Sequence, residues 1–138
     1  MKCFFDTNVL LDVLANREPF AQDSKAALSL ATTHGNVAVA SVLSFWNLAY
    51  LLRKLLPESA RRETLRNLSN LVRPEEVSAD DLTEAFDSPC PDFEDAVQIA
   101  CARATGADVI VTRDTEDFLK SPVPALSPAM FVAVMNTP

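Results

Sequence analysis

The sequence has few of the residues that several classes of functional site require. Its 138 residues include only two glycines, one histidine and three widely spaced cysteines. Neither a GxGxxG nor a P-loop motif is present, and two glycines leave little for any loop that cradles phosphate. The lone His34 stands at the expected end of a helix and supports no Ser-His or Cys-His nucleophile system. Cys3, Cys90 and Cys101 form no CxxC pair, which argues against a disulfide framework and a zinc cluster.

Long hydrophobic runs are also absent. The most apolar stretch, residues 37–52, is interrupted by Ser41, Ser44 and Asn47 and falls short of the ~18 apolar residues of a spanning helix. We interpret it as core. Asp6 interrupts the N-terminal segment where a signal peptide would need its apolar centre. These absences, with thiols that suit a reducing compartment, predict a cytoplasmic protein without membrane attachment.

The composition is that of an ordinary globular protein. Hydrophobic residues make up 49% of the chain and charged residues 22%. A chain of this length can bury one core without disulfide or metal staples. We therefore expect a single domain over residues 1–138.

The net charge of −7 disfavours nonspecific binding to a polyanion, but the charges are segregated along the chain. Residues 53–73 contain two acids and six basic residues, namely Arg53, Lys54, Arg61, Arg62, Arg66 and Arg73. Residues 74–102 contain nine acids and no Lys or Arg. This split favours a cation-binding acidic site beside a basic patch, while solvated helix faces are the alternative explanation.

Apolar patterns predict short strands that alternate with helices. Strands are expected at residues 1–5, 37–39 and 107–112, each an apolar run next to turn or capping residues. Helices are expected at about 9–14, 20–34, 42–56, 58–71, 82–86, 92–105 and 128–135, with a capping box at Ser78–Asp81 and an N-cap at Ser127 before Pro128. This alternation, without hairpin dipeptides, predicts a three-layer α/β/α fold with a parallel central sheet. Within the helix at 42–56, we expect Phe45, Trp46 and Tyr50 to face the core, with base-stacking platforms as the alternative.

Three acids are predicted to meet at one edge of that sheet. Asp6 and Asp114 each follow a strand, and the carboxyl ends of parallel strands lie at the same edge. Asp95 lies in the first turn of the helix that leads into the second of these strands. Converging carboxylates repel one another unless a hard cation such as Mg²⁺ or Mn²⁺ binds them. Helix capping is the alternative role for each of these acids and for Asp92.

Four segments together resemble the PIN-domain family. They are Phe4–Asp12 (FFDTNVLLD), Ser41–Tyr50 (SVLSFWNLAY), Asp92–Ala96 (DFEDA) and Val111–Phe118 (VTRDTEDF). They occur in the family's order and spacing across nearly the whole chain. Within the family, chains of this size resemble the VapC-like toxins and their stand-alone relatives.

The resemblance implies a set of site residues. Asp6, Asp95 and Asp114 would be the catalytic residues that bind Mg²⁺ or Mn²⁺, with Asp117 nearby. Thr7, Asn8, Ser41 and Thr112 would support that site through hydrogen bonds.

One position departs from the family pattern. Asn47 stands where many members have Glu, so the ligand set lacks one formal charge, although an Asn carbonyl oxygen can still serve as a weaker ligand. From i, i+3 geometry relative to Asp95, we expect Asp92 to supply the missing carboxylate to the metal.

The implied activity is that of a metal-dependent endoribonuclease, a hydrolase of RNA phosphodiesters and the toxin of a toxin-antitoxin pair. A bound ion would lower the pKa of a water molecule. RNA would approach along Arg53, Lys54, Arg61, Arg62 and Arg66. A homodimer and a cognate antitoxin are implied as partners.

Two other functions are alternatives to the nuclease. Asn47 favours a catalytically weakened PIN fold that serves as an RNA- or protein-binding scaffold. Phosphatase chemistry of the haloacid-dehalogenase type requires an Asp two residues after the nucleophile, and Asn8 occupies that position.

Overall fold

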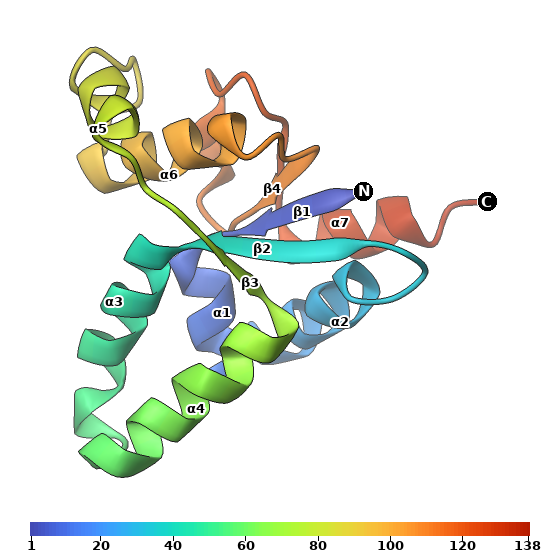
Figure 1. Ribbon diagram of the computed structural model, residues 1–138. Coiled ribbons are helices and arrows are strands. Elements are labelled where there is room, and N and C mark those ends of the chain that lie inside the picture. The colour runs from blue at the N-terminus through green and yellow to red at the C-terminus, as the bar shows by residue number, and fades with distance from the viewer.

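The computed structural model describes residues 1–138 and contains a five-stranded parallel sheet (Figure 1). The strand order is β3-β2-β1-β4-β5. The strands are β1 (Lys2–Phe5), β2 (Val37–Ser41), β3 (Arg73–Glu75), β4 (Val109–Val111) and β5 (Ala125–Leu126). In the central strand, Phe4 is in register with Val39 of β2 and Ile110 of β4. The predicted parallel sheet is confirmed.

Helices cover both faces of the sheet. They are α1 (Thr7–Leu14), α2 (Ala21–Ala31), α3 (Val42–Leu51), α4 (Glu58–Leu71), α5 (Ala79–Phe86), α6 (Phe93–Ala104) and α7 (Pro128–Met135), with 3-10 turns η1 (Leu52–Lys54) and η2 (Thr115–Phe118). Figure 1 shows α5 and α6 on one side of the sheet, and α1, α2 and the α3–α4 pair on the other. Helix α7 packs against α2 and shares its core cluster. None of these helices combines the length and the apolar character needed to cross a membrane.

Strand alternation divides the core between the two faces. Cys3 and Phe5 of β1 pack into a cluster with α1, α2 and α7, whereas Phe4 packs into a second cluster with α6. Phe4 and Phe5 are fully buried, and such a side chain contributes about 2 kcal/mol to stability through burial. The sheet is therefore covered on both faces, as its continuous apolar strands predict.

Two strands lead into helices without a loop. Asp6 follows β1 and caps α1, and Ser41 ends β2 and caps α3. The predicted capping box at Ser78–Asp81 and the Ser127–Pro128 helix start are also present. These direct transitions place helix N-termini and capping side chains at the carboxyl edge of the sheet.

Some predicted elements differ from the structure. The helix expected at 42–56 ends at Leu51 and continues as η1. The expected core positions of Trp46 and Tyr50 are wrong, because these side chains are 74% and 63% exposed, while Phe45 packs against the core. The fully buried side of α3 consists of Ser44 and Leu48. Trp46 and Tyr50 each stand two positions after one of these residues, which turns them about 200° around the helix and away from the core.

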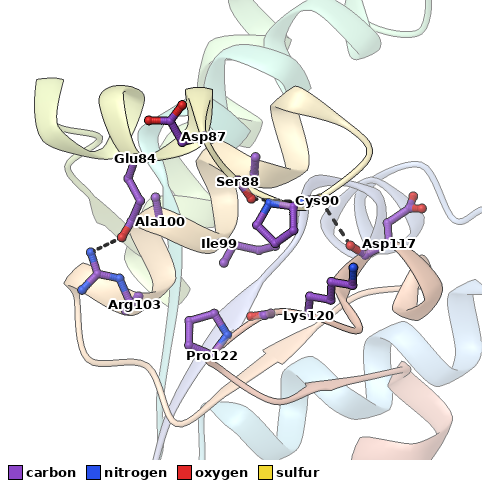
Figure 2. Close-up of a pocket in the computed structure, with 13 residues that line it drawn as sticks. Glu84, Asp87, Ser88, Cys90, Ile99, Ala100, Arg103, Asp117, Lys120 and Pro122 are labelled. Atoms are coloured by element: carbon purple, nitrogen blue, oxygen red, sulfur yellow. Dashed lines mark hydrogen bonds and ion pairs between the residues drawn. The ribbon is translucent and has the colours of Figure 1, made fainter.

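A cavity of about 340 Å³ lies between α5, α6 and the segment after η2 (Figure 2). Arg103 on its wall forms an ion pair with Glu84 (Nη2–Oε1 2.5 Å). Cys90 donates its thiol proton to the Asp117 carbonyl oxygen (3.3 Å). Figure 2 shows the Asp117 carboxylate directed away from the other labelled side chains, so this carboxylate serves a different part of the molecule.

Candidate metal centre

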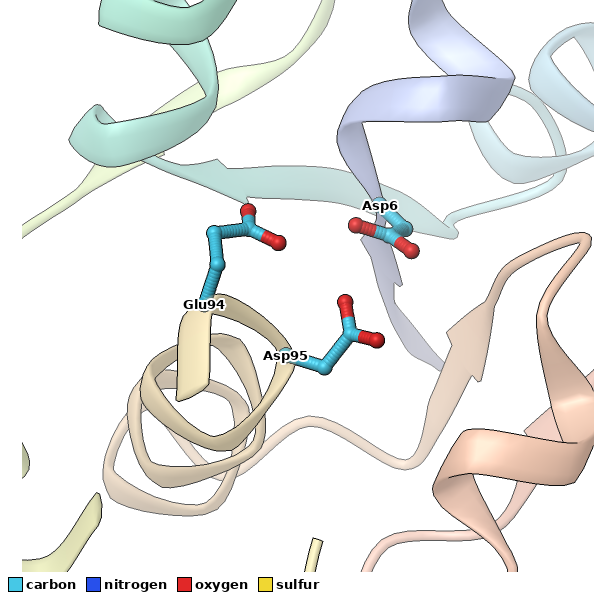
Figure 3. A group of neighbouring side chains, drawn as sticks. All are labelled: Asp6, Glu94 and Asp95. Atoms are coloured by element: carbon cyan, nitrogen blue, oxygen red, sulfur yellow. The ribbon is translucent and has the colours of Figure 1, made fainter. Parts of the chain in front are cut away.

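Three separate segments bring acids together at the carboxyl edge of the sheet. Asp6 comes from the β1–α1 junction, and Glu94 and Asp95 come from the first turn of α6. Figure 3 shows the three carboxylates turned toward one another. One oxygen from each of them lies within 4.8 Å of the others. We call Asp6, Glu94 and Asp95 the inner triad.

A second group of acids adjoins the first. Asp95, Asp114 and Asp117 also offer oxygens within 4.8 Å of one another, and we call them the outer triad. Asp114 follows β4, and Asp117 lies in η2. Asp95 belongs to both triads, so the edge of the sheet carries five neighbouring carboxylates. The structure thus gathers Asp6, Asp95, Asp114 and Asp117, as predicted from the sequence.

Glu94 is a member of the site that sequence reasoning missed. Its Oε1 accepts hydrogen bonds from Nδ2 of Asn47 (3.1 Å) and Nε2 of Gln98 (2.9 Å). The two amides hold Glu94 beside Asp6 and Asp95. The sequence signal was an acid next to Asp95 with a Gln four residues later, on the same helix face.

Asp92 lies outside both triads. Its Oδ1 accepts a hydrogen bond from the backbone N–H of Asp95 (3.0 Å), and its side chain is exposed. Asp92 is the N-cap of α6, and the capping hydrogen bond directs its carboxylate toward the backbone of the helix. The structure therefore gives Asp92 a capping role and places Glu94, rather than Asp92, beside Asp6 and Asp95.

Buried polar side chains support the inner triad from behind. Thr112 donates its hydroxyl to Oδ2 of Asp6 (2.8 Å), and Thr7 donates to Oγ of Ser44 (2.9 Å). Ser41 donates to Oε1 of Gln98 (2.6 Å), which in turn donates from Nε2 to Ser44 (3.0 Å). No buried side-chain nitrogen or oxygen lacks a partner. This network fixes the orientation of the Gln98 amide and thus of Glu94.

The outer triad is held by the segment after β4. Asn8 donates from Nδ2 to Oδ2 of Asp114 (3.0 Å), and the backbone N–H of Asp114 donates to Oγ1 of Thr112 (3.0 Å). Arg113 donates from Nε to Oδ2 of the fully buried Asp12 (2.8 Å). The predicted supporting residues Thr7, Asn8, Ser41 and Thr112 all lie in this framework, while Ser44 and Gln98 were not predicted.

The electrostatics of the inner triad favour a bound cation. Burial raises the pKa of Asp6 to about 7. The hydrogen bond from the Thr112 hydroxyl lowers this pKa, and the negative charge of Glu94 raises it further. Burial also raises the pKa of Asp95 to about 8, together with the charges of Asp6 and Glu94. No Lys or Arg forms an ion pair with any of the five carboxylates. An all-oxygen, uncompensated donor set fits a hard divalent cation such as Mg²⁺ or Mn²⁺.

The inner triad opens into a cleft of about 360 Å³. Asn47, Tyr50 and Leu51 of α3 form part of its wall, and Arg17 lies on its rim. None of the five predicted RNA-binding residues lines the cleft itself. Arg61 and Arg62 pair with Glu58, and Arg66 pairs with Glu63 (3.6 Å). Arg53 and Lys54, in the turn that follows α3, pair with no carboxylate.

Comparisons with known proteins agree with this architecture. A family model of the PIN domain matches residues 2–116, whereas no curated protein matches the sequence. A toxin-antitoxin complex from Klebsiella pneumoniae contains a similar chain, with 22% identity, a TM-score of 0.70, and coverage of 91% of this chain and 97% of that one.

Two further solved structures share the fold. VapBC-1 from nontypeable Haemophilus influenzae has 14% identity, a TM-score of 0.71, and coverage of 93% and 98% of the two chains. VapC20 from Mycobacterium tuberculosis, described as a sarcin-ricin loop cleaving toxin, has 23% identity, a TM-score of 0.61, and coverage of 78% and 86%.

Proposed function

The chain belongs to the PIN-domain family, and on that premise we propose that it is a metal-dependent endoribonuclease that acts as the toxin of a toxin-antitoxin pair. The observation that carries the proposal is the pair of carboxylate triads that share Asp95 and have no basic partner. The solved neighbours from toxin-antitoxin complexes support the choice of toxin.

In this proposal Asp6, Asp95 and Asp114 hold Mg²⁺ or Mn²⁺, with Glu94 and Asp117 as the additional carboxylates. A divalent cation at such a site supplies Lewis-acid activation of water and neutralises charge on the phosphodiester. Thr112 orients Asp6, and Asn8 orients Asp114. The hydrogen bonds that Glu94 accepts from the Asn47 and Gln98 amides both end on Oε1. Its Oε2 would take the proton of a water whose oxygen bonds to phosphorus, while the P–O bond to the leaving ribose oxygen breaks and that oxygen takes a proton from solvent.

The proposed partners follow from the same premise. RNA is the substrate, a small cognate antitoxin is the inhibitor, and the protein acts in the cytoplasm as a homodimer. Gel filtration at micromolar concentration tests the dimer, and a monomeric elution volume would contradict it.

The alternative function is a scaffold with weakened catalysis, favoured by Asn47 in place of an acid. The structure argues against the scaffold, because Asn47 and Gln98 together hold Glu94 at the inner triad. The carboxylate that position 47 lacks is therefore supplied by α6. We therefore favour the enzyme.

Cleavage of RNA by purified protein tests the proposal. A structured RNA and a transfer-RNA pool would be incubated with Mn²⁺, Mg²⁺ or EDTA, beside the Asp95→Asn variant. Asp92→Asn is the matched control, because it removes a nearby charge while Asn still caps the helix. We expect metal-dependent cleavage by the wild type and the control, and none by Asp95→Asn. A folded wild-type protein that binds no Mn²⁺ would instead support the scaffold.

A further inference from the structure

Tyr50 is an exposed aromatic residue on the wall of the acidic cleft. It lies in the last turn of α3, its side chain is 63% exposed, and the cleft that it lines also contains the inner triad. Asn47, one turn earlier on the same helix, bonds directly to Glu94. The turn of α3 that carries Tyr50 is therefore tied to the carboxylates.

Arg53 holds this ring from one side. Its guanidinium carbon lies 3.7 Å from the centroid of the Tyr50 ring, and its Nη1 donates a hydrogen bond to the Tyr50 carbonyl oxygen (2.7 Å). The ring stays 63% exposed with Arg53 in place, so its other face is open to solvent. Arg53 pairs with no carboxylate, which leaves its positive charge available to a phosphate.

We propose that Tyr50, supported by Arg53, is a stacking platform that positions one unpaired base of the RNA beside the inner triad. An open aromatic face backed by a cation is the arrangement that binds single-stranded nucleic acid, because every base offers a π-face. In a duplex both faces of each base are stacked on neighbours, and the platform has nothing to bind. This inference rests on the proposed ribonuclease function and assigns a substrate-positioning role to a residue outside the two triads.

Binding and cleavage are measured separately to test the platform. A labelled single-stranded RNA octamer and the duplex of the same sequence are titrated with protein in Ca²⁺, which occupies oxygen sites, and binding is read by fluorescence anisotropy. Tyr50→Leu removes the π-face but keeps an apolar side chain, and Tyr50→Phe keeps the face. Thermal unfolding and Mn²⁺ affinity confirm that each variant retains the fold and the metal centre.

We expect Tyr50→Leu to weaken single-stranded binding about tenfold or more, and Tyr50→Phe to stay within about twofold of the wild type. Duplex binding should be weaker in the wild type and unchanged by either variant. Equal binding of the octamer by the wild type and Tyr50→Leu would overturn the platform. This holds even if gel filtration shows a changed oligomeric state for Tyr50→Leu. No binding of the octamer by the wild type would overturn it as well.

The two proposals fail in different ways. If Tyr50→Leu loses octamer binding but the wild type shows no metal-dependent cleavage, the platform stands and the nuclease is rejected. Cleavage that persists with unchanged binding in Tyr50→Leu would keep the nuclease and reject the platform.

Discussion

The Asn47 amide donates a hydrogen bond to Oε1 of Glu94 across 3.1 Å and so joins α3 to the first turn of α6. A side chain that carries no charge thereby positions one that does. Gln98 donates to the same oxygen from the next turn of α6. The acid that the family pattern places on α3 is thus matched in this chain by an acid on the neighbouring helix.

The first prediction distinguishes Glu94 as a metal ligand from Asp92 as a helix cap. Glu94→Gln removes a charge from the inner triad, and we expect it to lower Mn²⁺ affinity at least about tenfold, as measured by isothermal titration calorimetry. Asp92→Asn should leave Mn²⁺ affinity unchanged, whereas Asp92→Ala should lower the free energy of unfolding by about 1 kcal/mol through loss of the cap. A large loss of Mn²⁺ affinity in Asp92→Asn would restore Asp92 as a ligand.

The second prediction moves the carboxylate back to α3. In Asn47→Glu/Glu94→Gln the donor and the acceptor exchange places, so the hydrogen bond between the helices can form with the charge on residue 47. We expect the double variant to bind Mn²⁺ more tightly than Glu94→Gln alone, by a coupling of about 1 kcal/mol or more in a double-mutant cycle. Additive effects of the two single changes would show that these residues do not act together.

The third prediction concerns pH and the metal-free protein. The pKa of Asp6 is raised to about 7 and that of Asp95 to about 8, so between about pH 5 and pH 8 the folded chain holds protons that the unfolded chain has lost. Stability rises with pH only where the unfolded state binds more protons, so here it must fall as pH rises. Urea unfolding in EDTA should show a loss of more than about 1 kcal/mol across this range.

Added Mn²⁺ and Asp6→Asn serve as the controls for that experiment. Mn²⁺ should stabilise the protein more at the alkaline end, because it binds the ionised carboxylates. Asp6→Asn should flatten the pH dependence. Stability that increases with pH in EDTA would show that the inner triad is ionised without cost in the folded protein.

The fourth prediction concerns the ion pair behind the outer triad. Arg113 donates to both oxygens of Asp12, which is fully buried, and Arg113 precedes Asp114 in sequence. Arg113→Met leaves that buried charge with only Ser24 and the more distant Arg17 as partners (3.1 and 3.4 Å). We expect a loss of about 3 kcal/mol in the free energy of unfolding and weaker Mn²⁺ binding.

Asp12→Asn in the Arg113→Met background removes the buried charge that has lost its nearest basic partner. It should recover part of the lost stability in urea unfolding. An equal stability of Arg113→Met and the wild type would show that the pair contributes nothing to the fold.

The fifth prediction ranks the basic residues. Reversing Arg53 and Lys54 to Glu should raise the KM for RNA at low salt more than reversing Arg61 and Arg62, because Glu58 already pairs with the latter two. Steady-state cleavage at two salt concentrations measures the difference. Equal effects would indicate that the whole segment attracts RNA through its summed charge.

Much of the fold and of the site followed from the sequence. The apolar runs and the capping residues predicted the alternation of strands and helices. The parallel topology predicted that Asp6 and Asp114 would share one edge of the sheet, and the helix start at that edge added Asp95. The edge strands β3 and β5 were missed, because β3 contains Arg73, Pro74 and Glu75 and β5 has two residues. Neither has the apolar pattern of a buried strand.

The side-chain details depended on packing that no local pattern records. Nearly every position of α3 is apolar or aromatic, so its buried stripe could not be read from periodicity, and Trp46 and Tyr50 were misplaced. Glu94 was overlooked because an acid in the first turn of a helix has an ordinary explanation in the helix dipole. Its role depends on Asn47, which is 47 positions away in sequence.

The carboxylates of the site come from both ends of the chain. Asp6 precedes Glu94 and Asp95 by almost 90 positions, and the outer triad is completed only with Asp117. The hydrogen bond from Thr112 to Asp6 spans 106 positions, so Asp6 lacks this partner before β4 has joined the sheet. A chain that stops before residue 117 therefore lacks a finished centre, and the proposed activity depends on translation through Asp117.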